Sequence, residues 1–258
     1  IIDQAIFSVL SLLRWEHDFE IWIYTDKEQS LHRFFASQNQ VQIKAITPEQ
    51  IKAWRGDIDF VHRVKLEIVR LAAKGSTQPV LYIDGDTIFI KNPQALRERV
   101  SPKQHVMHIQ ESRLAEAKDP LTKKIARFCK KQKFQLSSGV LQIPSSTAMW
   151  NAGVIGLHPL NFSFLDQMLE LTDVAYTLYQ KHVIEQLAVS YYLQSTGKVV
   201  ASDDIIYHYW QTKDIWQKRI DDFLKSVSSA SEALERLDQI DWSQPEPPRK
   251  KTWWERIF

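Results

Sequence analysis

The sequence has little cysteine, little glycine and no long apolar run: its 258 residues include one Cys and seven Gly. A single cysteine excludes an intramolecular disulfide and is typical of a reducing compartment, so we expect a cytoplasmic location. Cys129 stands in a helical apolar pattern and is expected to be a small buried side chain, not a nucleophile. No stretch reaches the roughly 18 consecutive apolar residues of a membrane-spanning helix.

An excess of charge of one sign is also missing. The chain has 33 basic and 31 acidic residues, a formal net charge of +2. This balance gives no global field that would attract nucleic acid, and we expect no nucleic-acid partner. With 44% hydrophobic and 25% charged residues, the composition is that of an ordinary globular protein. The length fits one large α/β domain with a substantial core.

Strand and helix patterns alternate over the first half of the chain, which predicts layers of an α/β fold. We expect strands over 19–24, 41–46 and 79–84, and helices over 3–13, 31–36, 48–54 and 61–74. Asp3 is the expected N-cap of the first helix, and Thr47 and Gln50 form a capping box around Pro48. The helix over 61–74 is expected to bury one face, made of Val61, Val64, Ile68, Leu71 and Ala72.

Beyond residue 92 the pattern is less regular. The expected elements are a strand over 106–110, a charged helix over 113–131, a strand over 154–157, helices over 162–178 and 182–195, short strands near 199 and 205–209, and helix to about 240. A proline-rich segment then leads into a basic and aromatic tail, residues 249–258.

Two carboxylates separated by one glycine follow the apolar run 79–84, which reads as a strand buried on both faces of a parallel sheet. Asp84 and Asp86 thereby come at the carboxyl end of a strand, the edge where open α/β sheets bind ligands. Such a pair repels unless a cation lies near it, and its oxygen ligands suit Mg²⁺ or Mn²⁺. Gly85 leaves room for a diphosphate over the turn. The alternative is that both Asp side chains only cap a turn.

A haloacid-dehalogenase-type phosphohydrolase uses the same arrangement, with the first Asp as nucleophile beside Mg²⁺. Asp203 and Asp204 would then imitate the later acidic pair of that family. Two features count against this alternative. Ile88 stands where that family has a hydroxyl or Val, and at least two strands precede a motif that normally opens the fold.

Several motifs, in the same order, resemble the retaining GT-A glycosyltransferases of the glycogenin and galactosyltransferase type, family 8. They span residues 1–216 and comprise Ser8 to Leu13 as first helix, Arg63-Val-Lys65-Leu66, the Asp-x-Asp strand Leu81 to Phe89, Trp150-Asn151-Ala152-Gly153-Val154, Glu185-Gln186, and Tyr207-His208-Tyr209 followed by Lys213 and Trp216. The last motif departs from the family, with Gln211 in place of its glycine and Ile215 in place of its proline.

The resemblance implies transfer of a hexose from a nucleoside-diphosphate sugar, expected to be a UDP-sugar, with retention at the anomeric carbon. It implies that Asp84, Asp86 and His208 bind the metal, and an imidazole ligand favours Mn²⁺ over Mg²⁺. The implied nucleotide and diphosphate contacts are Lys65, Arg63, Lys213, Gly85 and Gly153, and the implied groups at the sugar are Asn151, Gln186 and Asp86. The alternatives are a solvated helix face for Lys65 and Arg63, and a tight turn for 151–153.

The implied architecture is a mixed central sheet flanked by helices. We expect a GT-A catalytic domain over 1–216, and over 217–258 a helical C-terminal extension with the basic and aromatic tail. The family's first strand has no counterpart and is expected upstream of Ile1. The tail is an expected contact to a membrane surface, which makes the location peripheral to the membrane. The acceptor is a saccharide, a lipid-linked or a protein molecule, and a non-catalytic sugar-nucleotide-binding protein is a third hypothesis.

Overall fold

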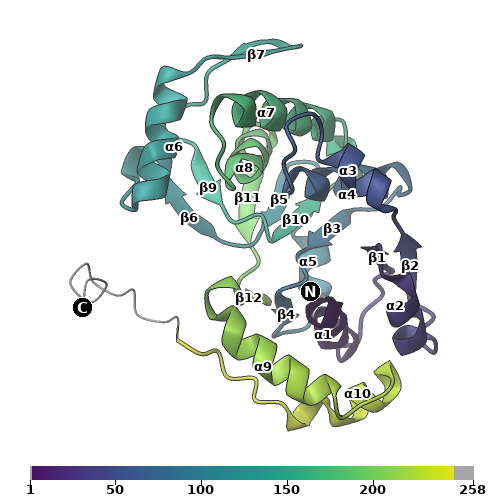
Figure 1. Ribbon diagram of the computed structural model, residues 1–258. Helices are drawn as coiled ribbons and strands as arrows, with labels where there is room; N and C mark the ends of the chain where they lie inside the picture. The colour runs from purple at the N-terminus through teal and green to yellow at the C-terminus, as the bar shows by residue number, and fades with distance from the viewer. Residues whose placement is uncertain (1, 247–258) are drawn as a thin grey trace.

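The computed structural model describes residues 2–246 as a mixed α/β fold (Figure 1). The strands are β1 (Ile21–Thr25), β2 (Val41–Ala45), β3 (Val80–Ile83), β4 (Thr87–Phe89), β5 (Gln104–Met107), β6 (Gln110–Arg113), β7 (Phe134–Leu136), β8 (Gly139–Leu141), β9 (Ala148–Trp150), β10 (Val154–Leu157), β11 (Lys198–Ala201) and β12 (Ile206–His208). The α-helices are α1 (Ile2–Leu13), α2 (Glu28–Phe35), α3 (Pro48–Trp54), α4 (Arg63–Lys74), α5 (Gln94–Glu98), α6 (Pro120–Lys131), α7 (Phe164–Leu178), α8 (Ile184–Thr196), α9 (Lys213–Leu224) and α10 (Ala230–Arg236).

The central sheet is mixed, as the sequence predicts. Its order is β11-β5-β10-β3, with β11 parallel to β5 and β10 antiparallel to both of its neighbours. Four two-stranded pairs surround it: β1 with β2 in parallel, and β4 with β12, β6 with β9 and β7 with β8 in antiparallel pairing. Helices α4, α7 and α8 pack together and contribute to a large apolar core beside the sheet.

The strand β3 differs from its prediction, because it is not buried on both faces of a parallel sheet. It pairs only with the antiparallel β10 within the described residues, and its side chains are only half-buried. Its other edge faces a cleft of about 700 Å³, whose lining includes residues of β1, α1 and α4. Strand β1 pairs only with β2 in the same part of the chain. The cleft therefore separates two strand edges.

Helix α4 ends as predicted but begins two residues later, and the predicted buried face was mostly wrong, although its Ala72 is buried. Val61 and Leu71 are 57% and 40% exposed, whereas Leu66 and Val69 are buried. Several apolar residues in this stretch fit helical spacing on two neighbouring faces, and packing against α7 selects the one that carries Leu66, Val69 and Ala73.

Two helix starts were also predicted wrongly. Helix α6 begins at Pro120, after strand β6 and the short 3₁₀ helix η1 (Leu114–Glu116), and not at residue 113. The carboxylate of Asp119 accepts a hydrogen bond from the Thr122 N–H and caps α6, and proline suits the first helical position. Asp3 lies inside the first turn of α1 and is not its N-cap. The capping box of Thr47 and Gln50 is present as predicted.

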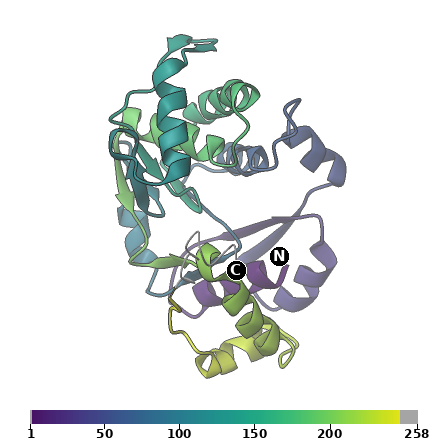
Figure 2. The ribbon, with the colours of Figure 1, turned by 60° about the vertical axis from the view of Figure 1, so that its left-hand side comes forward.

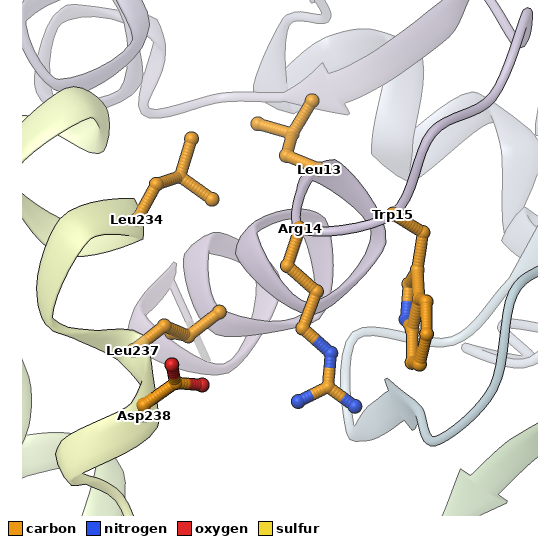
Figure 3. Close-up of a pocket in the computed structure, with 6 residues that line it drawn as sticks. All are labelled: Leu13, Arg14, Trp15, Leu234, Leu237 and Asp238. Carbon is orange, nitrogen blue, oxygen red and sulfur yellow. The ribbon is translucent and has the colours of Figure 1, made fainter.

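The C-terminal helices share one apolar core with the N-terminal helix. Phe7 and Leu10 of α1 pack in one cluster with Trp216 and Ile220 of α9 and with residues of α10, and these helices lie side by side at the base of the molecule (Figure 1). The expected boundary between 216 and 217 falls inside α9. A cavity of about 520 Å³ remains between the end of α1 and the segment 234–238. Its lining includes Arg14 and Trp15 from the first and Leu234, Leu237 and Asp238 from the second (Figure 3).

Among residues 2–246, no helix combines the length and apolar character that crossing a bilayer requires. The tail 249–258, expected to contact a membrane, lies outside the described residues. Cys129 is buried, and burial raises the pKa of its thiol to about 12. That pKa suits the predicted role as a small core side chain and not as a nucleophile.

Candidate functional site

The turn between β3 and β4 carries the two aspartates. The N–H of Asp84 donates to the carbonyl oxygen of Gly153 at 2.8 Å and continues the pairing of β3 with β10. The hydroxyl of Thr87 then donates to the carbonyl oxygen of Asp84 at 2.7 Å, and it shares a hydrogen bond with Ser8 of α1. These contacts fix the turn, so the carboxylates of Asp84 and Asp86 have a defined position at the end of the central sheet.

A strand from the far end of the sequence brings the third residue. Strand β12 pairs with β4 so that His208 lies opposite Thr87, directly after Asp86. The N–H of Tyr209 also donates to the carbonyl oxygen of Asp86 at 3.2 Å. As a result, ligand atoms of Asp84, Asp86 and His208 lie within 4.8 Å of one another.

The hydrogen bonds of Asn151 determine which nitrogen of His208 carries a proton. The Gly153 N–H donates to Oδ1 of Asn151 at 2.9 Å, and Nδ1 of His208 lies 3.0 Å from the same oxygen. Because that oxygen only accepts, Nδ1 must be the protonated nitrogen. The lone pair of a neutral ring then lies on Nε2, 3.1 Å from Oδ1 of Asp86. Two acceptors at this distance repel unless an additional proton or a cation lies between them.

Gly153 is required for this arrangement. A β-carbon at that position would come within 2.6 Å of two ring atoms of His208. The tight turn that precedes β10 therefore has a specific purpose, because it leaves space for the imidazole. Asn151, expected at the sugar, holds the imidazole in place through its carbonyl oxygen.

Asp84 is surrounded by fixed donors. Nζ of Lys65 lies 3.1 Å from Oδ2 of Asp84, 3.0 Å from the Ala152 carbonyl oxygen and 3.5 Å from Glu185. Tyr82 donates its hydroxyl to Oδ1 of Asp84 at 2.6 Å. Burial alone would lower the pKa of Lys65, but the charges of Asp84 and Glu185 outweigh it and raise that pKa. Lys65 is therefore a charged neighbour of Asp84 at neutral pH.

Asp86 is also held by cationic or polar neighbours. Nζ of Lys213 lies 3.2 Å from its Oδ2, and the Lys213 side chain is 47% exposed. Burial would raise the pKa of Asp86, but its interactions with the His208 ring and with the charge of Lys213 lower that pKa far below its usual range. Asp86 is consequently ionised at neutral pH. Lys213 is the most exposed residue of this group.

A glutamate that the sequence patterns did not indicate joins two of the expected residues. Glu111 of β6 accepts hydrogen bonds from Nδ2 of Asn151 at 3.0 Å and from Nε2 of Gln186 at 2.8 Å. The hydrogen-bonded chain thus runs from Asp86 through His208, Asn151 and Glu111 to Gln186. Glu111 is exposed, whereas both amides are largely buried. It lies in a polar strand with no apolar motif, so no sequence signal distinguishes it from a surface residue.

Two expected contact residues lie apart from this group. The guanidinium of Arg63 pairs with Asp173 and Glu67 and donates to the carbonyl oxygen of Trp54. The bond to Glu67 lies within α4, and the others connect α4 to α3 and α7. Gly85 faces α1, since a β-carbon there would meet Ala5 at an ordinary 3.7 Å.

The later acidic pair of the phosphohydrolase alternative is engaged elsewhere. Asp204 forms a two-point ion pair with Arg99, and neither it nor Asp203 belongs to the cluster around Asp86. Within residues 2–246, Asp203 and Asp204 therefore do not supply the second acidic pair that the phosphohydrolase alternative requires beside the Asp-x-Asp turn.

The donor set of the cluster fits a divalent cation. An octahedral ion binds its ligands at about 2.1 Å, which places ligand atoms at most about 4.2 Å apart. The three side chains therefore need only small shifts from their spacing of 4.8 Å or less. Two carboxylate oxygens with one imidazole nitrogen suit Mn²⁺ better than Mg²⁺. Asn151 would act behind His208, where it orients the ring for the ion.

No protein-family model matches the chain, and no curated protein sequence matches it. Among solved structures, the glycosyltransferase GlyE of Streptococcus pneumoniae superposes with a TM-score of 0.52 at 14% identity, over 94% of this chain and 64% of that one. The fold is of the GT-A type. The bifunctional glycosyltransferase WbbM, in its apo form, matches 77% of this chain and 37% of its own at 12% identity and a TM-score of 0.48. The chain thus spans less than two thirds of either protein, and the likeness to GlyE concerns the fold alone.

Proposed function

We propose that the protein is a metal-dependent glycosyltransferase that moves a hexose from a nucleoside-diphosphate sugar, expected to be a UDP-sugar, to a saccharide, lipid-linked or protein acceptor. The proposal includes retention at the anomeric carbon, in the manner of the family 8 enzymes that the motifs resemble. The observation that carries it is the close approach of the Asp84 and Asp86 carboxylates and the His208 imidazole at the carboxyl end of β3.

The proposal assigns the metal ion and the diphosphate to different side chains. Asp84, Asp86 and His208 would hold Mn²⁺, which as a Lewis acid offsets the charge on a departing nucleoside diphosphate. Lys65 keeps Asp84 in place through an ion pair. Lys213 pairs with Asp86 in this structure, and we assign its exposed ammonium to the diphosphate because a metal ion on Asp86 would replace it there.

The sugar and the acceptor are assigned to the other end of the hydrogen-bonded chain. Gln186 and the exposed Glu111 offer amide and carboxylate groups to hydroxyls. Glu185, on the first turn of α8, has a buried Oε2 that accepts no hydrogen bond from residues 2–246. A buried acceptor without a donor is unfavourable, and a ligand hydroxyl would satisfy it.

Metal binding and nucleotide release test the proposal. Isothermal titration with Mn²⁺ should show one site in the wild type, which Asp86→Asn and His208→Gln weaken at least about tenfold. A matched control is Asp57→Asn, since Asp57 is exposed and forms no ion pair within residues 2–246. Nucleotide release from a panel of nucleoside-diphosphate sugars should require both Mn²⁺ and Asp86.

The alternatives have their own outcomes. Tight donor binding without release, in the presence of potential acceptors, supports a non-catalytic sugar-nucleotide-binding protein. Phosphate release from phosphate monoesters supports the phosphohydrolase and contradicts the proposal. Wild-type Mn²⁺ affinity in both Asp86→Asn and His208→Gln would overturn the assignment of the metal ligands.

A further inference from the structure

The most one-sided charge of the chain lies on and beside α6. Residues 118–133 contain seven basic residues and one acidic residue, a net charge of +6 in a chain whose net charge is +2. All seven basic side chains are exposed, and we name them the α6 cationic face: Lys118, Lys123, Lys124, Arg127, Lys130, Lys131 and Lys133. None of them forms an ion pair with any other part of residues 2–246.

The basic residues of the α6 cationic face do not stabilise the helix that carries them. Lys123 and Lys131 each lie one turn from Arg127, and like charges at this spacing destabilise a helix. Lys123 also lies near the amino end of α6, where the helix dipole disfavours cations. The acid at that end, Asp119, is engaged as the N-cap. The repulsion is therefore not balanced inside the described part of the protein.

Exposed apolar side chains lie on two segments that contact α6. The β7–β8 hairpin is tied to it by a hydrogen bond from Gln142 to the Lys130 carbonyl oxygen, and its Val140 is 62% exposed. At the end of α7, Tyr179 packs on Phe128 of α6 with ring centres 4.9 Å apart, and the adjacent Leu178 is 50% exposed. Figures 1 and 2 show α6 at the periphery of the molecule, and it lies in front in Figure 2.

We propose that the α6 cationic face docks the protein onto an anionic lipid surface. Clustered lysines and arginines are attracted to anionic headgroups, and nearby apolar side chains enter the interface between headgroups and acyl chains. The combination of unpaired cations with Val140 and Leu178 favours a bilayer over a soluble polyanion, which would need only the charges. The α6 cationic face is distinct from the candidate active site, and vesicle binding can be measured without a catalytic assay.

Vesicle sedimentation tests this docking on the full chain. Vesicles of equal parts phosphatidylglycerol and phosphatidylcholine should bind the wild type at about 0.1 M salt, and pure phosphatidylcholine should not. Since each basic residue contributes about fivefold, the triple variant Lys123→Gln, Arg127→Gln, Lys130→Gln should bind about a hundredfold more weakly. The control Lys52→Gln, Lys103→Gln, Lys225→Gln removes the same charge from exposed lysines on other elements and should bind within about threefold of wild type.

Several outcomes would overturn the inference. An equal loss in both triple variants would mean that vesicles respond only to net charge. A loss on truncation after residue 246, with no loss in the α6 variant, would place the contact in the tail. The variant Val140→Ser, Leu178→Ser retains every charge and should weaken vesicle binding severalfold but leave binding to polyphosphate unchanged. Wild-type binding to polyphosphate without binding to the anionic vesicles would contradict a lipid partner.

Discussion

A β-carbon on Gly153 would lie 2.4 Å from Nδ1 of His208, closer than any real contact of this kind. Gly153→Ala must therefore displace the imidazole from Asp86. We expect a loss of stability of about 1–3 kcal/mol and at least tenfold weaker Mn²⁺ binding. Urea unfolding and isothermal titration measure the two effects.

Gly85→Ala is the matched control for that variant. The added methyl group would meet Ala5 at 3.7 Å, an ordinary contact, and the backbone at Gly85 is not in the left-handed region. Stability and metal affinity should stay close to wild type. If both alanine variants lose metal affinity equally, the specific contact between residues 153 and 208 is not the cause.

The contact between Asn151 and Glu111 predicts a compensating pair of substitutions. Asn151→Asp alone sets two carboxylates against each other, and Glu111→Gln alone sets one amide N–H₂ group against another. In the double variant, the new amide at 111 accepts from Gln186 and donates to the new carboxylate at 151. Each single variant should lose about 1–3 kcal/mol in unfolding free energy, and the double variant should recover at least about 1 kcal/mol of the summed loss. Additive losses in a double-mutant cycle would argue against a direct contact.

His105 predicts a pH dependence of stability. Its ring is fully buried against Thr196, and burial lowers its pKa below the usual value of 6.5 for histidine. Above pH 6.5 the ring is neutral in both the folded and the unfolded state. Below that pH the unfolded chain takes up the proton first, so the unfolding free energy falls as the pH falls.

His105→Gln removes this titration. The variant should be less stable than wild type at pH 7.5, and the difference should narrow when guanidinium unfolding is repeated down to pH 5. A difference that stays constant, or grows, with falling pH would contradict a lowered pKa.

Along β1 and β3, backbone amides that point into the cleft should exchange their hydrogen faster than the amides between them. The Ile21 N–H points to β2 and that of Asp84 to β10, so the N–H groups of Trp22, Tyr24, Leu81 and Ile83 point into the cleft. These four should exchange at least about a hundredfold faster than Ile23 and Tyr82, which bond to neighbouring strands. Hydrogen exchange followed by NMR resolves the two sets. Equal protection of all six amides would contradict an open cleft between β1 and β3.

Features set by neighbouring residues were predictable from sequence. The capping box at Thr47 depends on four consecutive residues, and the end of α4 coincides with Gly75. The buried face of α4 was not predictable, because two apolar faces compete and only contact with α7 selects one. The start of α6 was misplaced because a polar strand and a charged helix have similar composition.

In the candidate site, too, residues that follow a motif were predictable and long-range partners were not. Motif order led to Asp84, Asp86 and His208, and the structure brings them together. The partner of Asn151 was missed, because Glu111 lies in a mostly exposed strand whose pairing with β9 is a long-range event. The ion pair of Arg63 was missed for a related reason. Its partner Asp173 is 110 residues away and is invisible to local patterns.

The pairing of β4 with β12 joins residues 86 and 208, which are 122 positions apart. An ion that binds there in the folded state but not in the unfolded chain would stabilise the contact between these distant segments. In a protein with one cysteine, the cation would thus take over the stabilising role that a disulfide has elsewhere. Chelation would then loosen the junction between the central sheet and the C-terminal helices as well as remove the electrophile.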